Sequence, residues 1–178
     1  MALYFDVMKK DHVKLAWSFS VNSQKCDDPE IFKLQLVGAL SDMEAGNSVT
    51  HVFIDDSNGK KAIAGFVTLR ASAYLTQYPG DDNFNAYPAI EIQCLAVDEK
   101  FEGQGIGTLL VKQAIVLADE LRQKYIGVQY IVLRSNRKSL SFYKRKTFGF
   151  KELSKVGKLA ADNWNKDCEP LIVRLHNV

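Results

Sequence analysis

Three glycines stand at alternate positions, Gly103, Gly105 and Gly107, and an apolar segment follows them. Glycine adopts positive φ readily and lets a ligand approach the backbone closely. If a helix starts here, the N–H groups of its first turn have no intrahelical acceptor, and the helix dipole favours negative charge. The segment therefore predicts an anion-binding loop, although a flexible turn that glycine makes tolerable would give the same pattern.

The spacing of these glycines distinguishes between known phosphate-binding loops. A P-loop needs lysine and then serine or threonine after its last glycine, but here Thr108 follows Gly107 directly. The dinucleotide-binding fingerprint has the pattern GxGxxG, so its third glycine would come one position later than Gly107. A methyltransferase loop matches only loosely, because "DEKFE" separates the glycines from the preceding strand. These comparisons exclude a P-loop kinase or NTPase.

Two segments together resemble the GNAT superfamily of N-acetyltransferases. "LAVDEKFEGQGIGTLLVKQAI" is similar to the family's coenzyme A loop, Arg/Gln-x-x-Gly-x-Gly/Ala, whose last three positions are filled by residues 105–107. "NRKSLSFYKRKTFGF" is similar to its second motif, with Tyr143 seven residues after Asn136 and then Gly149-Phe150. The two segments cover roughly residues 90–150. The chain departs from the family in having Glu102 at the first loop position, and in a gap of six residues rather than four between Tyr143 and Gly149.

This resemblance implies transfer of an acetyl group from acetyl-CoA, the cosubstrate, to an amine, with no metal. It also implies three sets of cosubstrate-binding residues: a strand beside the pantetheine arm (Leu95, Ala96, Val97), a loop around the pyrophosphate (Glu102, Gly103, Gln104, Gly105, Ile106, Gly107, Thr108), and a later group (Asn136, Lys138, Tyr143). Asn136 would contact pantetheine, and Lys138 or a neighbouring basic residue would meet the 3′-phosphate. Because a carboxylate repels pyrophosphate, the Glu102 side chain has to point away from it.

The resemblance also implies two catalytic residues. A free lysine-like amine has a pKa of about 10.4 and must lose a proton before it attacks, and Glu91 is the candidate base, acting through water. A backbone N–H near Val97 would stabilise the oxyanion. Tyr143 would protonate the departing thiolate. The alternatives are that Tyr143 is a core aromatic residue, that Glu91 is an exposed or ion-paired strand residue, and that water chains replace a single base.

The elements that must position these residues follow from periodicity, capping and turn signals. Residues 28–46 predict a helix capped by Asp28, with Pro29 in its first turn and Gly46 at its end. Asn58-Gly59 predicts a hairpin turn, and "QYPGDDNFNAYP" predicts a loop at residues 77–88. The remaining segments predict strands at 48–55, 61–72, 89–97, 128–135, from 148 and at 170–176, a helix at 106–121 and a short basic helix at 137–146.

This element order predicts one α/β domain over residues 1–178, and the resemblance implies that its fold is GNAT-like. Its central sheet would be mixed, largely antiparallel and twisted, with helices on both faces. The length and the 47% apolar and 25% charged composition suit a single soluble domain with a real core.

Composition also limits the cellular setting. No apolar run approaches the roughly 20 residues of a membrane span, and "MALYFDVMKK" lacks a signal-peptide layout, so we expect a cytoplasmic protein with no membrane partner. The cysteines are too few for a disulfide framework or a thiolate zinc site, and the histidines have no metal-ligand spacing. Cys94 is expected in the core. The cysteines are Cys26, Cys94 and Cys168, and the histidines are His12, His51 and His176.

Charge is distributed unevenly along the chain. Residues 134–158 contain nine basic residues and one acid, so this segment carries +8, and the other residues carry −6 because the whole chain is +2. Such a segment favours an anionic ligand, either coenzyme A phosphates or RNA, but a solvated lysine-rich face would look the same.

The sequence leaves the acceptor open. The broad expectation is an amine on a small molecule, peptide or protein. The overall layout is also similar to the acetyltransferase toxins of bacterial toxin–antitoxin pairs, which implies aminoacyl-tRNA as a specific alternative. A non-catalytic acyl-CoA-binding module is the third possibility, and a homodimer remains open.

Overall fold

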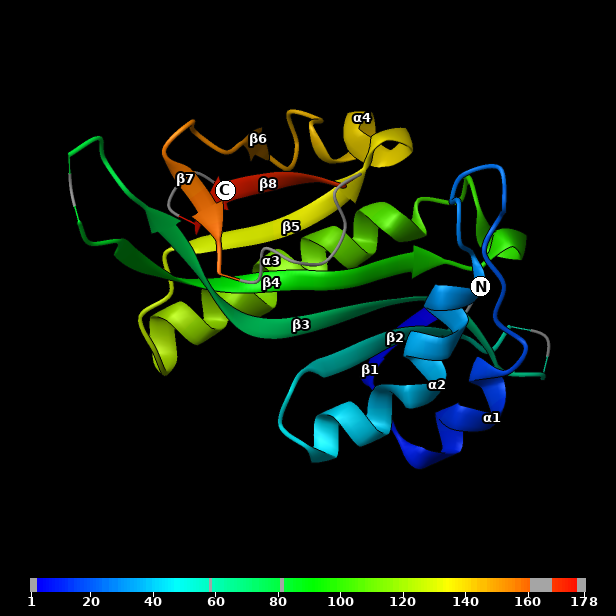
Figure 1. Ribbon diagram of the computed structural model, residues 1–178. Helices are drawn as coiled ribbons and strands as arrows, with labels where there is room; N and C mark the ends of the chain where they lie inside the picture. Colours follow the sequence, from blue (N-terminus) through cyan, green and yellow to red (C-terminus); the bar gives the residue numbers. More distant parts are fainter. Residues whose placement is uncertain (1–2, 58, 81, 161–167, 176–178) are drawn as a thin grey trace. The chain divides into compact units, whose positions relative to one another are not determined.

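The computed structural model describes residues 3–57, 59–80, 82–160 and 168–175 (Figure 1). Within these ranges the strands are hydrogen-bonded in the order β1-β2-β3-β4-β5-β8-β6, with β7 on β3, and all pairings that we describe are antiparallel except β4–β5. This confirms the predicted mixed, largely antiparallel sheet. The chain forms two compact units, Met1–Arg70 with Gln93–Val111 and Ala71–Ile92 with Lys112–Val178. In the described ranges no helix is long and apolar enough to cross a membrane.

The first unit contains the N-terminal strands and helices. Its β1, β2 and β3 pair antiparallel, with a bulge between Phe53 and Ile54. The last residues of β4 and the first turn and a half of α3 also belong to it. Its elements are β1 Leu3–Val7, η1 Lys10–His12, α1 Val13–Ala16, α2 Glu30–Glu44, β2 Val49–Asp55, part of β3 Ala62–Thr76, part of β4 Asn85–Val97, η2 Glu99–Phe101 and part of α3 Ile106–Lys124.

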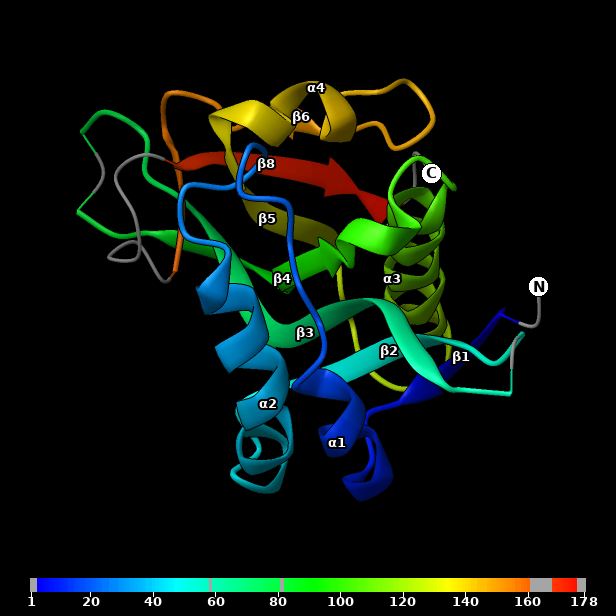
Figure 2. The ribbon, with the colours of Figure 1, turned by 90° about the vertical axis from the view of Figure 1, so that its right-hand side faces the viewer.

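Helices α1 and α2 cover one face of this unit's strands (Figure 2). Leu36 and Ala39 are three residues apart on α2, so they lie on the same side of the helix and both are buried. Phe19 meets Phe66 of β3 edge-on, with ring centroids 5.4 Å apart. The core cluster around them contains Met8, Ala16, Phe19, Leu36, Ala39, Val52, Ile54, Ile63, Phe66, Cys94 and Ala96.

On the opposite face of β3, the start of α3 and the end of β4 come close to Gly65. Because successive strand residues point to opposite faces, Gly65 faces away from Phe66. A Cβ at Gly65 would lie 2.9 Å from the carbonyl oxygen of Ala96 and 3.0 Å from side-chain carbons of Ile106 and Leu110. The absence of a side chain here therefore lets the start of α3 pack directly on β3.

The second unit is built on β5, which pairs in parallel with residues 89–92 of β4 and antiparallel with β8. β6 pairs with β8, and β7 with β3. Ala89, Val132 and Leu159 form a small core, and Tyr74 and Tyr130 pack against it. The elements of this unit that have not yet been given are β5 Tyr130–Asn136, η3 Arg137–Ser139, α4 Leu140–Tyr143, β6 Lys151–Glu152, β7 Gly157–Leu159 and β8 Cys168–Arg174.

Several element boundaries differ from the sequence prediction. Asp28 does not cap α2; the N-cap is Pro29, which has no side-chain cap bond. Gly46 follows the helix with φ of 72°, as the stop signal predicted. The predicted loop 77–88 is wrong at its end, because β4 already begins at Asn85. The basic helix ends early, at Tyr143. Asn58 and His176 lie outside the described residues.

Helix α3 buries one face and leaves some of its apolar residues exposed. Its buried residues recur at intervals of three and four, and they include Ile106, Leu110, Ala114 and Ala118. Leu109 is apolar and three residues from Ile106, but it is 43% exposed. It lies one residue from Leu110, about 100° around the helix, which turns it away from the buried side.

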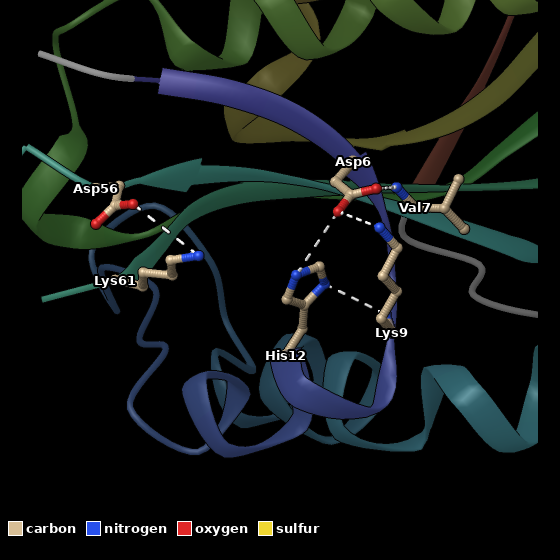
Figure 3. Close-up of polar contacts among 6 residues, drawn as sticks. All are labelled: Asp6, Val7, Lys9, His12, Asp56 and Lys61. Carbon is tan, nitrogen blue, oxygen red and sulfur yellow. Dashed lines mark hydrogen bonds and ion pairs between the residues drawn. The ribbon is translucent and has the colours of Figure 1, made fainter.

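A polar cluster fixes the chain where β1 leads into η1 (Figure 3). The Asp6 carboxylate accepts hydrogen bonds from the backbone N–H of Val7 (2.9 Å) and from Lys9 Nζ (2.7 Å). His12 Nδ1 accepts from the backbone N–H of Lys9 (3.2 Å), and His12 Nε2 lies 3.9 Å from Asp6. The His12 ring is buried, and its burial lowers its pKa from the ordinary value of 6.5. The neutral ring is therefore the form that acts as the acceptor here.

Candidate functional site

The glycine segment leaves β4 through a well-anchored turn. β4 ends at Val97, and the backbone N–H of Asp98 donates to the carbonyl of Ala64 in β3 (3.0 Å). Asp98 is 3% exposed. One oxygen of its carboxylate accepts from the backbone N–H of Lys100 (3.0 Å), and the other from the backbone N–H of Ser20 (3.0 Å). Asp98 therefore fixes both the start of η2 and a distant part of the chain.

Two of the three glycines have the backbone conformation that requires glycine. Gly103 has φ of 73° and Gly105 has φ of 83°. A Cβ at either residue would meet nothing within 4 Å, so open space borders the backbone. Gly107 instead lies in the first turn of α3, which begins at Ile106. The first N–H groups of a helix point out of its end without an intrahelical acceptor, so this loop has the geometry of an anion cradle.

Glu102, the departure from the family's loop pattern, points toward another part of the first unit. Its Oε2 accepts hydrogen bonds from Lys25 Nζ (2.6 Å) and from Asn22 Nδ2 (3.4 Å). The carboxylate is therefore neutralised by an ammonium group. The expectation that Glu102 must point away is consistent with this contact.

The strand residues proposed to meet pantetheine are the last three of β4. Ala96 is buried, and Leu95 and Val97 are half-buried. The parallel register of β4 with β5 ends at the pair Ile92↔Leu133, so residues 95–97 lie past its last paired residue. Cys94, beside them, is in the core as expected, and burial raises the pKa of its thiol, which makes it a poor nucleophile.

The predicted residues of the second unit lie on β4, β5, η3 and α4. Glu91 is 3% exposed and stands opposite Val132 in the β4–β5 register, so the interpretation of an exposed strand residue is wrong. Asn136 ends β5, and its side-chain Oδ1 accepts from the backbone N–H of Ser139 (2.8 Å), which caps η3. Sequence analysis missed this capping role. Lys138 is exposed on η3.

Tyr143 is the last residue of α4 and is 8% exposed. Its ring packs edge-on against Phe142 and Phe150, with centroid distances of 4.9 and 6.1 Å. The longer gap before Gly149 forms an exposed turn, in which the N–H groups of Phe148 and Gly149 donate to the carbonyl of Arg145 (3.0 and 3.3 Å). The turn contains the extra residues, and Phe148 and Phe150 return to the buried interior.

The basic segment is mostly a solvated surface. Its lysines and arginines after Tyr143 are all exposed: Lys144, Arg145, Lys146, Lys151, Lys155 and Lys158. Lys144 is paired with Glu152, and Lys158 Nζ lies 3.9 Å from the centroid of the Phe84 ring. Among the residues that the structure describes, no group of three or more His, Cys, Asp or Glu side chains is arranged to hold a metal ion.

Sequence reasoning missed the part of the first unit that contacts this loop. Ser20, Asn22 and Lys25 are separated by 77 to 80 residues from their partners in the loop. No local pattern signals contacts over such a separation. The buried cap at Asp98 was detectable, since an aspartate directly before a short turn is a common N-cap.

Comparisons with known proteins agree on the fold. The model of the acetyltransferase (GNAT) family matches residues 14–150, whereas no curated protein sequence matches the chain significantly. A mutant of the toxin AtaT, bound to the C-terminus of the antitoxin AtaR and acetyl-CoA, aligns with a TM-score of 0.73 and 17% identity over 98% of this chain and 94% of that one. AtaT complexed with acetyl-methionyl-tRNAfMet aligns with a TM-score of 0.74 and 17% identity over 98% of this chain and 96% of that one. A mutant of KacT aligns with a TM-score of 0.75 and 15% identity over 99% of this chain and 96% of that one.

Proposed function

This chain belongs to the acetyltransferase (GNAT) family, and we propose that it moves the acetyl group of acetyl-CoA to a primary amine of its acceptor. The observation that carries the proposal is the glycine loop. Two glycines with positive φ border open space at the start of α3, and the carboxylate directly before them, that of Glu102, is paired with Lys25. The family match covers parts of both units, which supports one N-acetyltransferase domain over residues 1–178.

Acetyl-CoA binding is proposed to use three groups of residues. The backbone N–H groups of residues 104–108 hold the pyrophosphate, because they lie at the N-terminal end of α3. Residues 95–97 offer backbone N–H and C=O groups to the pantetheine arm, since they follow the last β4 residue that pairs with β5. Asn136 contacts the arm through its Nδ2, because its Oδ1 already accepts from Ser139, and Lys138 meets the 3′-phosphate.

For the transfer itself we propose a direct attack of the neutral amine on the thioester. Glu91 takes the amine proton through water, and a backbone N–H near Val97 stabilises the oxyanion. The C–S bond then breaks, and the Tyr143 hydroxyl protonates the departing thiolate. Glu91 and Tyr143 are both buried, and electrostatic interactions are stronger where water is largely excluded.

Aminoacyl-tRNA is the second candidate acceptor. Two observations favour it: the exposed basic residues of segment 134–158, which suit a phosphate backbone, and the structural likeness to a toxin solved with acetyl-methionyl-tRNAfMet. An amine on a small molecule, peptide or protein remains the broader proposal. We also propose a cytoplasmic location, which the free thiols of Cys26, Cys94 and Cys168 support.

Calorimetric titration with acetyl-CoA tests the proposal, with S-adenosylmethionine and NAD as controls. Selective micromolar binding of acetyl-CoA is expected, and preference for a control would refute the cosubstrate. Thiol release in the presence of an amine panel that includes charged tRNA then identifies the acceptor. Binding without thiol release for any amine would favour a non-catalytic acyl-CoA-binding module. A tRNA affinity that falls steeply with salt would favour RNA.

A further inference from the structure

A short segment between α1 and α2, residues 20–25, lies against the cosubstrate loop; we call it the strap. At its first residue, the backbone N–H of Glu99 donates to the carbonyl of Ser20 (2.9 Å). The Ser20 N–H donates to the buried Asp98 carboxylate (3.0 Å), and its hydroxyl to Glu99 Oε1 (2.8 Å). The strap is therefore tied to the turn that leads from β4 into the loop.

Its other end reaches the loop itself. Lys25 Nζ lies 2.6 Å from Glu102 Oε2, and Asn22 Nδ2 reaches the same oxygen at 3.4 Å. The Glu102 side chain is 23% exposed and that of Lys25 63% exposed. Glu102 directly precedes Gly103, the first glycine of this loop with positive φ. Without Lys25, an uncompensated carboxylate would stand next to the backbone that has to accept a pyrophosphate.

We propose that Lys25 is a positioning residue for acetyl-CoA: it holds the Glu102 carboxylate on the strap and cancels its charge, so that the loop accepts the pyrophosphate. The inference rests on the proposed binding of acetyl-CoA by this loop. It gives the unusual glutamate a role, since the pair makes the affinity for phosphate depend on the strap. Cosubstrate binding and ordering of the strap are then coupled, and by linkage each favours the other.

A double-mutant cycle on the pair separates this role from simple support of the loop. K25M leaves the charge of Glu102 uncompensated, and acetyl-CoA should bind about 3- to 5-fold more weakly, which is the upper part of the range that a partly exposed charge pair allows. E102Q releases a lysine next to the loop, and binding should tighten by about 2-fold. The double variant K25M/E102Q should return to within about 2-fold of wild type. K14M removes an exposed lysine from α1 and should bind as wild type does.

Calorimetric dissociation constants for acetyl-CoA decide the outcome. If the pair only supported the loop, K25M and E102Q would weaken binding equally, because either one breaks the contact. If Lys25 touched the phosphate directly, E102Q would not rescue K25M. Either result overturns the inference, as would equal affinities for all variants. A wild-type protein that binds no acetyl-CoA would instead refute the proposed function itself.

Discussion

Replacement of Gly65 by alanine tests how closely β3 and the start of α3 pack. The added Cβ would lie 2.9 Å from a backbone carbonyl oxygen, that of Ala96, and 3.0 Å from carbons of the buried Ile106 and Leu110. The carbonyl belongs to a paired strand and cannot rotate away, so the helix start has to move. Overpacking of this kind typically costs about 1–3 kcal/mol.

Thermal unfolding measures this cost. For a chain of this length 1 kcal/mol corresponds to about 2–4 °C in Tm, so Gly65→Ala should lower Tm by about 2–12 °C. Gly38→Ala is the matched control, because Gly38 lies inside α2 and a Cβ there meets nothing within 4 Å. Its better helix propensity should stabilise the protein by about 1 kcal/mol.

The same pair of variants should differ in cosubstrate binding. Gly65→Ala displaces Ile106, the first residue of α3, whose neighbouring N–H groups are proposed to hold the pyrophosphate. It should therefore weaken acetyl-CoA binding, whereas Gly38→Ala should not. A Tm for Gly65→Ala at or above that of wild type would refute the close packing that we infer.

Three further predictions concern the site and its support. Tyr143→Phe should lower turnover by about 100-fold or more and leave the acetyl-CoA dissociation constant within about 2-fold; equal turnover would exclude Tyr143 as the acid. Asn136→Ala should lose the cap of η3 and about 1 kcal/mol of unfolding free energy, measured in urea, and an unchanged midpoint would contradict the cap. The free energy of unfolding should fall as the pH is lowered from 7.5 to 5.5, because the pKa of His12 is lowered in the folded protein and the unfolded chain takes up its proton near 6.5. His12→Gln should lose less unfolding free energy over this range, and a loss equal to that of wild type would exclude His12 as the cause.

The features that sequence predicted well are those fixed by local backbone chemistry. The turn at Gly103 and Gly105 needs positive φ, and Gly46 ends α2 for the same reason. The apolar spacing along α3 likewise places Ile106 and Leu110 in the core. Each of these signals acts over a few residues, and so a single sequence can show it.

The features that sequence could not predict depend on contacts between distant residues. Nothing near Lys25 indicates that it pairs with Glu102, 77 residues away. Strands β1 and β7 are short, and they are stabilised by pairing with β2 and β3 rather than by a pattern of their own. The expected cap at Asp28 was wrong because Pro29 takes that position in the folded chain.

The turn that follows α4 offers a way to measure how well ordered the chain is around Tyr143. This turn begins with three consecutive exposed basic residues, Lys144, Arg145 and Lys146. A backbone hydrogen bond from the N–H of Lys144 to the carbonyl of Leu140 (3.0 Å) joins them to α4. Trypsin cleaves after lysine and arginine in segments that can unfold locally. The rate of tryptic cleavage at this turn therefore reports how often α4 opens. Any ligand that orders α4 would slow cleavage there, so the assay can be used without knowing the acceptor.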